Sequence, residues 1–203
     1  MSRLRTRPTR DDTREKLFEA AARVFEEQGI GGASVEAIAA AAGFTRGAFY
    51  SNFKSKDELI IAMLEDHVEQ SIRRSHELLA LHRNLAEFVE ALKNIDRSRQ
   101  DPLGRSPLLH MEMILFVARA EKRRPDLAKR LRARRKMIAD IVETTSKNNG
   151  RNGYLNPTWT GAIMLALEDG FRLHRLIDPE TTPADSFLRA IGDLQRAMGI
   201  ASA

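Results

Sequence analysis

The amino-acid sequence predicts an all-α protein of about nine helices. Apolar residues recur at helical spacing along the 203 residues, and no segment shows the alternation of apolar and polar residues that is typical of a strand. Capping residues precede several of these stretches, and glycine or proline marks their limits. We therefore expect a small N-terminal group of three helices, followed by six helices in the rest of the chain.

The first predicted helix runs from about Asp12 or Thr13 to Gln28. Asp12 and Glu15 fit a capping box at its start, and Gly29 fits its stop. Its apolar residues fall on one stripe and are expected in the core: Leu17, Phe18, Ala21, Val24 and Phe25.

The segment from 34 to 58 is the most informative part of the chain. Ser34 is predicted to cap a second helix, and Gly43 to end it in the left-handed backbone conformation. Thr45 is predicted to cap a third helix of about two turns, which reaches roughly Phe53. The alanines between the two helices allow a close, steep crossing. This geometry is typical of a helix-turn-helix, whose second helix enters the major groove of DNA.

The predicted third helix has two different faces. Phe49 and Phe53 lie four residues apart and fit an anchor to the core. The other face offers hydroxyl and amide groups for phosphates, one arginine for a guanine edge, and small residues that allow close approach. The candidate DNA-contact residues on this face are Thr45, Arg46, Gly47, Ala48, Tyr50, Ser51 and Asn52. The alternative is a small helical hairpin with a partly exposed tyrosine.

A capping box formed by Ser55 and Glu58 predicts the start of a fourth helix, from near Lys56 to about Leu81. Lys56 lies in the first turn of this helix, where the helix dipole and an ammonium group both favour a phosphate. Lys56 is therefore the eighth candidate for DNA contact.

The run GFTRGAFYSNFKSKDEL resembles the recognition-helix region of the TetR family (TetR/AcrR type) of bacterial transcription regulators. The residues that carry this resemblance are Gly43, Thr45, Phe49, Tyr50, Phe53, Lys56 and Leu59. The resemblance implies a cytoplasmic, DNA-binding repressor in which Arg46 reads a base, while Tyr50 and Lys56 mainly hold phosphates. This resemblance extends to individual residues near the N-terminus, whereas in the rest of the chain it covers mainly the order and length of helices.

The remaining helices are predicted from apolar spacing and from Asn156 and Thr182, each of which precedes a proline. They cover residues 84–98, 107–122, 125–147, 157–177 and 183–198, with loops at 101–107 and 148–156. By domain, we expect a basic flexible arm over 1–11, a helix-turn-helix domain over 12–55, and a ligand-binding and dimerisation domain over 56–203.

Basic residues gather in two places. Arg3, Arg5, Arg7 and Arg10 precede the first acidic residue and fit either an arm that follows DNA or a solvated tail. Residues 119–136 hold ten Lys or Arg but only two acidic residues. This second cluster fits the solvent face of two helices, or contact with an anionic ligand, a membrane surface or DNA.

Composition excludes several classes of function. The chain has no cysteine, which excludes disulfides, thiolate zinc sites and cysteine nucleophiles. No apolar run approaches the roughly 20 residues of a membrane span, and the basic N-terminus lacks the apolar core of a secretory signal. The motifs of common hydrolases, nucleotide-binding proteins and zinc enzymes are missing. We therefore predict neither an enzyme nor a metal or cofactor site, and the net charge of +5 suits a polyanionic partner.

The resemblance also implies a homodimer formed through the last two helices, which binds an inverted-repeat operator in double-stranded DNA and is released by a small-molecule inducer. Core packing is the competing interpretation for each residue of the dimer faces and of the pocket. The pocket candidates are Met63, His67, Phe88, His110, Met111, Ile114, Phe116, Trp159 and Phe171. The alternative function is a ligand-independent DNA-binding or nucleoid-associated factor that is controlled by a protein partner.

Overall fold

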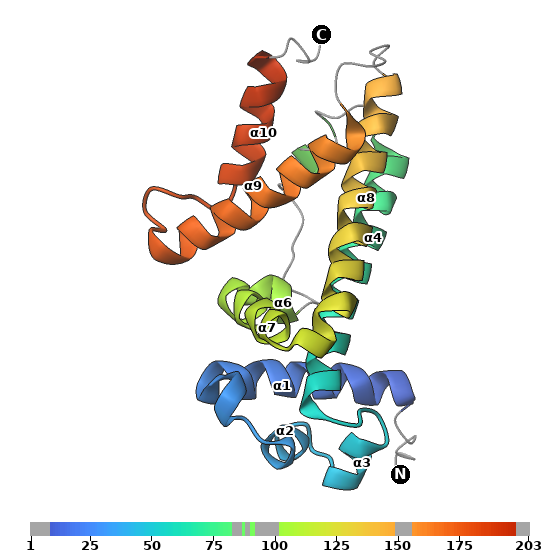
Figure 1. Ribbon diagram of the computed structural model, residues 1–203, viewed down its shortest axis with the longest axis vertical. Coiled ribbons are helices and arrows are strands. Elements are labelled where there is room, and N and C mark those ends of the chain that lie inside the picture. Colours follow the sequence, from blue (N-terminus) through green and yellow to red (C-terminus); the bar gives the residue numbers. More distant parts are fainter. Residues whose placement is uncertain (1–8, 83–86, 88–89, 92–101, 149–155, 198–203) are drawn as a thin grey trace, which may run out of the picture. The chain divides into compact units, whose positions relative to one another are not determined.

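The computed structural model describes residues 9–82, 87, 90–91, 102–148 and 156–197. These residues form nine α-helices, one 3-10 helix and no strand (Figure 1). The predicted all-α class is therefore confirmed. Most of the predicted helix over 84–98 and most of the predicted loop over 148–156 fall outside the described residues, and so does the arm up to residue 8.

The chain divides into two compact units. Unit 1 comprises Met1–His67 and Gln100–Leu127, and unit 2 comprises Val68–Arg99 and Ala128–Ala203. Unit 1 therefore contains more than the helix-turn-helix, because residues that follow position 100 join it. The functional boundary that we predict after residue 55 stays a prediction.

Unit 1 is built around its first helix. Helix α1 packs against α2, α6 and α7, and α2 packs against α3. Apolar side chains from these helices and from the start of α4 form one continuous core. The bounds are α1 (Arg10–Gly32), α2 (Val35–Ala41), α3 (Arg46–Tyr50), α4 (Lys56–Leu81), α6 (Pro102–Arg105) and α7 (Pro107–Arg119), followed by the 3-10 helix η1 (Glu121–Arg123).

The start of α1 differs from the prediction, and its end agrees. The capping box is formed by Thr9 and Asp12, three residues before the predicted one: the hydroxyl of Thr9 accepts from the amide of Asp12, whose carboxylate accepts from the amide of Thr9. Gly29 has a φ of 70° and interrupts the helix, as its position predicts. Residues Ile30 to Gly32 continue only as a last turn beyond this kink.

Two other predictions in unit 1 need correction. Residues 102–105 form a short helix rather than a loop, because Leu103 is buried in the core. The following helix ends at Arg119 rather than near Lys122, where the chain changes to the 3-10 turn.

Unit 2 contains the rest of α4, the part of α8 (Arg124–Asn148) from Ala128 onward, α9 (Pro157–Ile177) and α10 (Ser186–Ala197). One core cluster joins α8 to Leu165 of α9, with Ile72 and Leu78 of α4 packed against it. Asn156 caps α9 as predicted, and its side chain accepts from the amide of Trp159 at 3.1 Å. Helix α10 starts at Ser186 rather than at Pro183, because residues 183–186 first form a turn.

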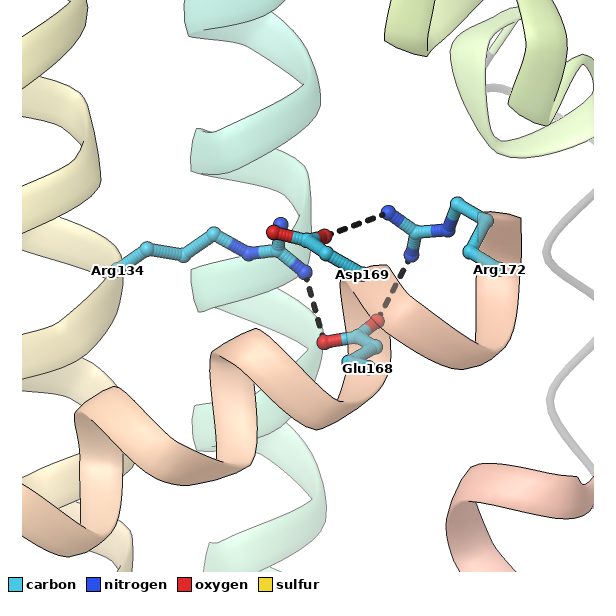
Figure 2. Close-up of polar contacts among 4 residues, drawn as sticks. All are labelled: Arg134, Glu168, Asp169 and Arg172. Carbon is cyan, nitrogen blue, oxygen red and sulfur yellow. Dashed lines mark hydrogen bonds and ion pairs between the residues drawn. The ribbon is translucent and has the colours of Figure 1, made fainter. Parts of the chain in front are cut away.

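Helices α8 and α9 approach closely at a glycine and are joined by a buried ion network. A Cβ atom on Gly161 would lie 2.6 Å from the carbonyl oxygen of Arg135, so the glycine is required by the contact. Further along α9, one carboxylate oxygen of Glu168 lies 3.0 Å from Nη2 of Arg134, and the other lies 2.8 Å from Nη2 of Arg172 (Figure 2). Arg172 also reaches Asp169 at 3.4 Å.

Candidate DNA-binding surface

Local caps hold the two short helices of the predicted helix-turn-helix. The hydroxyl of Ser34 accepts from the amide of Ala37 at 3.0 Å, and the hydroxyl of Thr45 accepts from the amide of Ala48 at 3.2 Å. Gly43 has a φ of 74°, as its place between the helices predicts. The helix-turn-helix geometry is therefore confirmed, although α3 ends at Tyr50 and continues to Phe53 only as a turn.

Aromatic packing fastens α3 to the core. Phe49 and Phe53 are almost completely buried, with ring centroids 5.8 Å apart, and Phe18 of α1 stacks on Phe53. The guanidinium of Arg14 lies 4.9 Å from the centroid of the Phe53 ring and covers it on the solvent side. This anchoring leaves the opposite face of α3 directed outward.

The outward face contains most of the predicted DNA-contact residues. Thr45, Arg46, Gly47, Tyr50 and Ser51 are exposed, whereas Ala48, Asn52 and Lys56 are half-buried. The structure thus brings the candidate residues of α3 to one surface.

Three of the polar candidates also hold the backbone of α3. Thr45 is the cap described above, and the hydroxyl of Ser51 donates to the carbonyl of Gly47 at 2.9 Å. The side-chain amide of Asn52 donates to the carbonyl of Ala48 at 2.9 Å, while its Oδ1 is buried with no hydrogen-bond partner among the described residues. These residues shape the surface as well as forming part of it.

Lys56 has a structural role that the sequence did not indicate. Its ammonium donates to the carbonyl of Ile30 at 2.6 Å and to the carbonyl of Ala33 at 2.7 Å. It therefore closes the C-terminal end of α1 against the start of α4. At most one of its three N–H groups is left for a phosphate.

Arg46 is held on the surface by two neighbours. Its Nη1 lies 3.1 Å from Oε1 of Glu36, and its guanidinium lies 5.4 Å from the centroid of the Tyr50 ring. Hydrogen bonding to Tyr50, followed by the charge of Glu36, raises the pKa of Arg46, so the guanidinium stays charged. Glu36 was missed by sequence reasoning, and the available signal was an acidic residue in the first turn of α2.

Gly47 is not required by packing within the chain. A Cβ atom at this position would meet only the Thr45 hydroxyl, at the ordinary contact distance of 3.7 Å. Glycine in a helix usually reduces stability relative to alanine. Packing among the described residues therefore does not explain the glycine on this face.

Comparison with known proteins gives a family match for the helix-turn-helix region. Residues 17–63 match the family model described as bacterial regulatory proteins, tetR family. Residues 17–63 therefore contain a DNA-binding domain of the TetR family type. The matched residues include most of α1, all of α2 and α3, and the start of α4, so the family match contains the surface of α3 described above.

Relatives and solved structures agree with this assignment. The transcriptional regulator TtgR of Pseudomonas putida is 38% identical over 88 residues, which are 43% of this chain and only 40% of TtgR. UidR of Escherichia coli is 24% identical over 162 residues, which are 78% of this chain and 79% of UidR. A TetR-family regulator from Cytophaga hutchinsonii shares the fold, with a TM-score of 0.70 at 20% identity over 95% of this chain and 98% of that one.

An open groove borders the helix-turn-helix. The start of α1 contributes Thr9, Arg10 and Thr13, and α3 with its flanking residues contributes Phe44, Ala48, Ser51 and Asn52. Arg10, which we predict as part of the basic arm, lines the same groove as Asn52.

The pocket candidates are distributed over both units. Met63, His67 and His110 are buried in unit 1, and the imidazole centroids of His67 and His110 lie 4.5 Å apart. In unit 1, Met111, Ile114 and Phe116 are half-buried, and in unit 2 so is Phe171. Trp159 is 69% exposed on α9, and Phe88 lies outside the described residues. The assignment of these residues to a ligand pocket stays a prediction.

Two other kinds of site, a membrane span and a metal site, are not found in the described part of the chain. Within it, no helix has the combination of length and hydropathy that is needed to cross a membrane. In the same residues, no group of three or more His, Asp or Glu side chains lies close enough to bind a metal ion.

Proposed function

We propose that this TetR-family regulator binds a specific inverted-repeat DNA sequence as a homodimer, represses transcription there, and is released by a small molecule. The observation that carries the DNA-binding part is the outward face of α3. It presents an exposed, charged Arg46 beside a glycine that internal packing does not require.

In this proposal each residue of the surface has a distinct task. Arg46 reads a guanine edge, because a guanidinium can donate to O6 and N7 together. Gly47 and Ala48 let the backbone approach, and Tyr50 holds a phosphate. The groove that contains Arg10 accepts the DNA backbone, while Thr45, Ser51 and Asn52 hold the helix and contact phosphates from its edge.

The test is selection of bound sequences from random duplex DNA by the purified full-length protein, at near-physiological salt. Recovery of one inverted repeat supports the proposal. Recovery of no motif, with binding that disappears steeply as salt rises, contradicts it, because that behaviour is typical of non-specific electrostatic binding. Gly47→Ala should fold normally and bind the selected sequence more weakly, since its methyl group occupies only external space.

The surface of α9 supports the dimer. Its exposed and half-exposed small and apolar residues alternate at spacings of four and three residues, which is the pattern of a helix–helix seam. The residues of this seam are Trp159, Ile163, Ala166, Gly170, Leu173 and Ile177. A Cβ atom on Gly170 would have no neighbour within 4 Å, so the single chain leaves space at the seam. Trp159, predicted as a pocket residue, lies on this seam.

Sedimentation equilibrium tests the dimer. The wild-type chain should be dimeric, and Ile163→Glu should be monomeric because it places a charge on the seam. Thr158→Glu is the control, since it adds the same charge at an exposed position outside the seam. A monomeric wild type, or equal effects of both substitutions, contradicts this interface.

For release by a small molecule, the support is the resemblance to the family together with a buried polar pair, His67 and His110, in an otherwise apolar core. A ligand changes DNA affinity only if it binds one state better, and a coupling of about 1–3 kcal/mol changes affinity about 5–150-fold. Compounds that raise the melting temperature should be tested for loss of binding to the selected DNA. Stabilising compounds that never change DNA affinity would contradict this part.

The alternative function is a ligand-independent, nucleoid-associated factor. Genome-wide mapping of bound sites separates the two proposals. A few sites at promoters favour the repressor, whereas many dispersed sites without a ligand response favour the alternative.

A further inference from the structure

Glu36 and Arg46 form a contact between the first turn of α2 and the first residue of α3. Nη1 of Arg46 lies 3.1 Å from Oε1 of Glu36. The same guanidinium lies over the ring of Tyr50, which meets the fully buried Phe49 edge-on, with ring centroids 5.6 Å apart. The guanidinium is therefore linked to the core through two aromatic rings and is also held by a carboxylate.

The exposure of this pair indicates that it contributes little to folding stability. The side chain of Arg46 is 64% exposed and that of Glu36 is 55% exposed. Ion pairs in such surroundings contribute little to folding, because water screens them and the side chains lose freedom. A carboxylate on a surface that faces DNA also repels phosphates. Folding stability therefore does not explain Glu36, and we expect its role to lie in DNA binding.

We infer that Glu36 is a positioning residue that holds Arg46 for reading a guanine base. This inference rests on the proposed DNA-binding function. A guanidinium has five N–H donors in a rigid planar fork. With Nη1 paired to Glu36, the edge formed by Nε and Nη2 is not used by that ion pair and can donate to O6 and N7 of a guanine.

The carboxylate also disfavours the competing uses of Arg46. Without Glu36, the long and flexible arginine can swing to a phosphate, which attracts it in every DNA sequence. With Glu36 in place, that movement breaks an ion pair and leaves a carboxylate next to the phosphate backbone. Glu36 thereby lowers non-specific affinity and raises the preference for guanine at the position that Arg46 reads.

The consequence is measurable as base discrimination. A good bidentate arginine–guanine contact is worth about 5–150-fold in preference over another base. We expect Glu36→Gln, which keeps the shape and removes the charge, to lower this preference at least about fivefold. The same variant should bind unrelated DNA more tightly than the wild type does.

The experiment is a double-mutant cycle on the full-length protein with the selected operator and its single-base variants. It compares wild type, Glu36→Gln, Arg46→Ala and the double variant, each checked for an unchanged thermal melting curve. Glu36→Gln should lose preference at one base pair per half-site and should have no further effect on base preference in the Arg46→Ala background. Glu27→Gln is the control, because it removes one exposed negative charge from α1.

Three results would overturn the inference. Glu36→Gln could leave the base preference unchanged, it could reduce it equally with and without Arg46, or the Glu27→Gln control could reproduce its effect. Failure of the proposed function is distinguishable from these results, because wild type itself would then select no motif. That result would remove the inference together with the function.

Discussion

Arginine–glutamate ion pairs occur in both units, and their surroundings differ. In unit 1, Arg46 and Glu36 lie 3.1 Å apart with more than half of each side chain exposed. In unit 2, Arg134 and Glu168 lie 3.0 Å apart with only 10% and 17% of their side chains exposed. Similar distances thus occur in very different dielectric surroundings, and the strength of a charge interaction depends on both. The exposed pair leaves a cation available to an external partner, whereas the buried pair joins α8 to α9.

The buried pair also shows how charges are accommodated in a core. Each carboxylate oxygen of Glu168 has its own guanidinium partner, one from α8 and one from α9 (Figure 2). Removal of charge from water is costly unless the charge is paired and hydrogen-bonded. Glu168 therefore holds the two guanidinium groups together, and its loss should affect both.

The loss of Glu168 is expected to have the largest effect on the free energy of unfolding. Glu168→Ala leaves two mostly buried guanidinium groups without this carboxylate, so the free energy of unfolding should fall by about 3 kcal/mol. Glu36→Ala, the matched substitution at the exposed pair, should cost less than about 1 kcal/mol. Urea unfolding at one protein concentration measures both. Equal losses would contradict the expectation that the exposed pair contributes less to the free energy of unfolding than the buried pair.

The next largest effect on stability is expected when the two glycines of α9 are replaced by alanine. Gly161→Ala should lower stability by about 1–3 kcal/mol, because its Cβ would overlap a backbone carbonyl of α8. Gly170→Ala meets no atom of the single chain and should stabilise the helix by up to about 1 kcal/mol. Urea unfolding at two protein concentrations separates this helix effect from subunit association. A similar loss for both variants would contradict the close approach at Gly161.

Lys56 extends this comparison, because it lies beside the proposed DNA-binding surface and its ammonium also donates to two backbone carbonyls. Lys56→Met should cost about 1–2 kcal/mol of stability, since the carbonyls of Ile30 and Ala33 lose charged donors. If its role is structural, the salt dependence of DNA binding should not change. A decrease of about 1 in the salt slope would instead show a phosphate contact. Lys54→Met is the control, because it removes an exposed neighbouring charge.

The smallest effect is expected at the start of α1. Hydrogen bonds from the amide and then the hydroxyl of Thr9 lower the pKa of Asp12 below its ordinary value of 3.8. A carboxylate with a lowered pKa stabilises the fold above the unfolded pKa, and this contribution disappears as the pH falls through the folded value. Asp12→Asn should therefore be less stable than wild type at pH 5, and the difference should shrink as the pH falls below 3.8.

Urea unfolding at several pH values measures this difference. Asp11→Asn is the control for a neighbouring exposed carboxylate in the same turn. A difference between wild type and Asp12→Asn that stays constant with pH would contradict the capping role of the charge.

Signals that act over a few residues were predictable. Ser34, Thr45 and Asn156 are caps as expected, and Gly29 and Gly43 have the left-handed conformation that ends a helix. The main error was the start of α1, where Thr9 and Asp12 form the capping box that was assigned to Asp12 and Glu15. Both assignments satisfy the same local pattern, so only the backbone geometry distinguishes them.

By itself, the sequence determined the all-α class, the helix-turn-helix and the outward face of α3, because caps, glycine turns and apolar spacing act within one or two helical turns. Tertiary structure alone decided the contacts between distant segments. The partners of Lys56 are 23 and 26 residues away, Glu168 is 34 residues from Arg134, and Glu36 meets Arg46 across the turn between helices. Such contacts depend on how helices pack, and helix packing is a property of the whole core that no short sequence pattern contains.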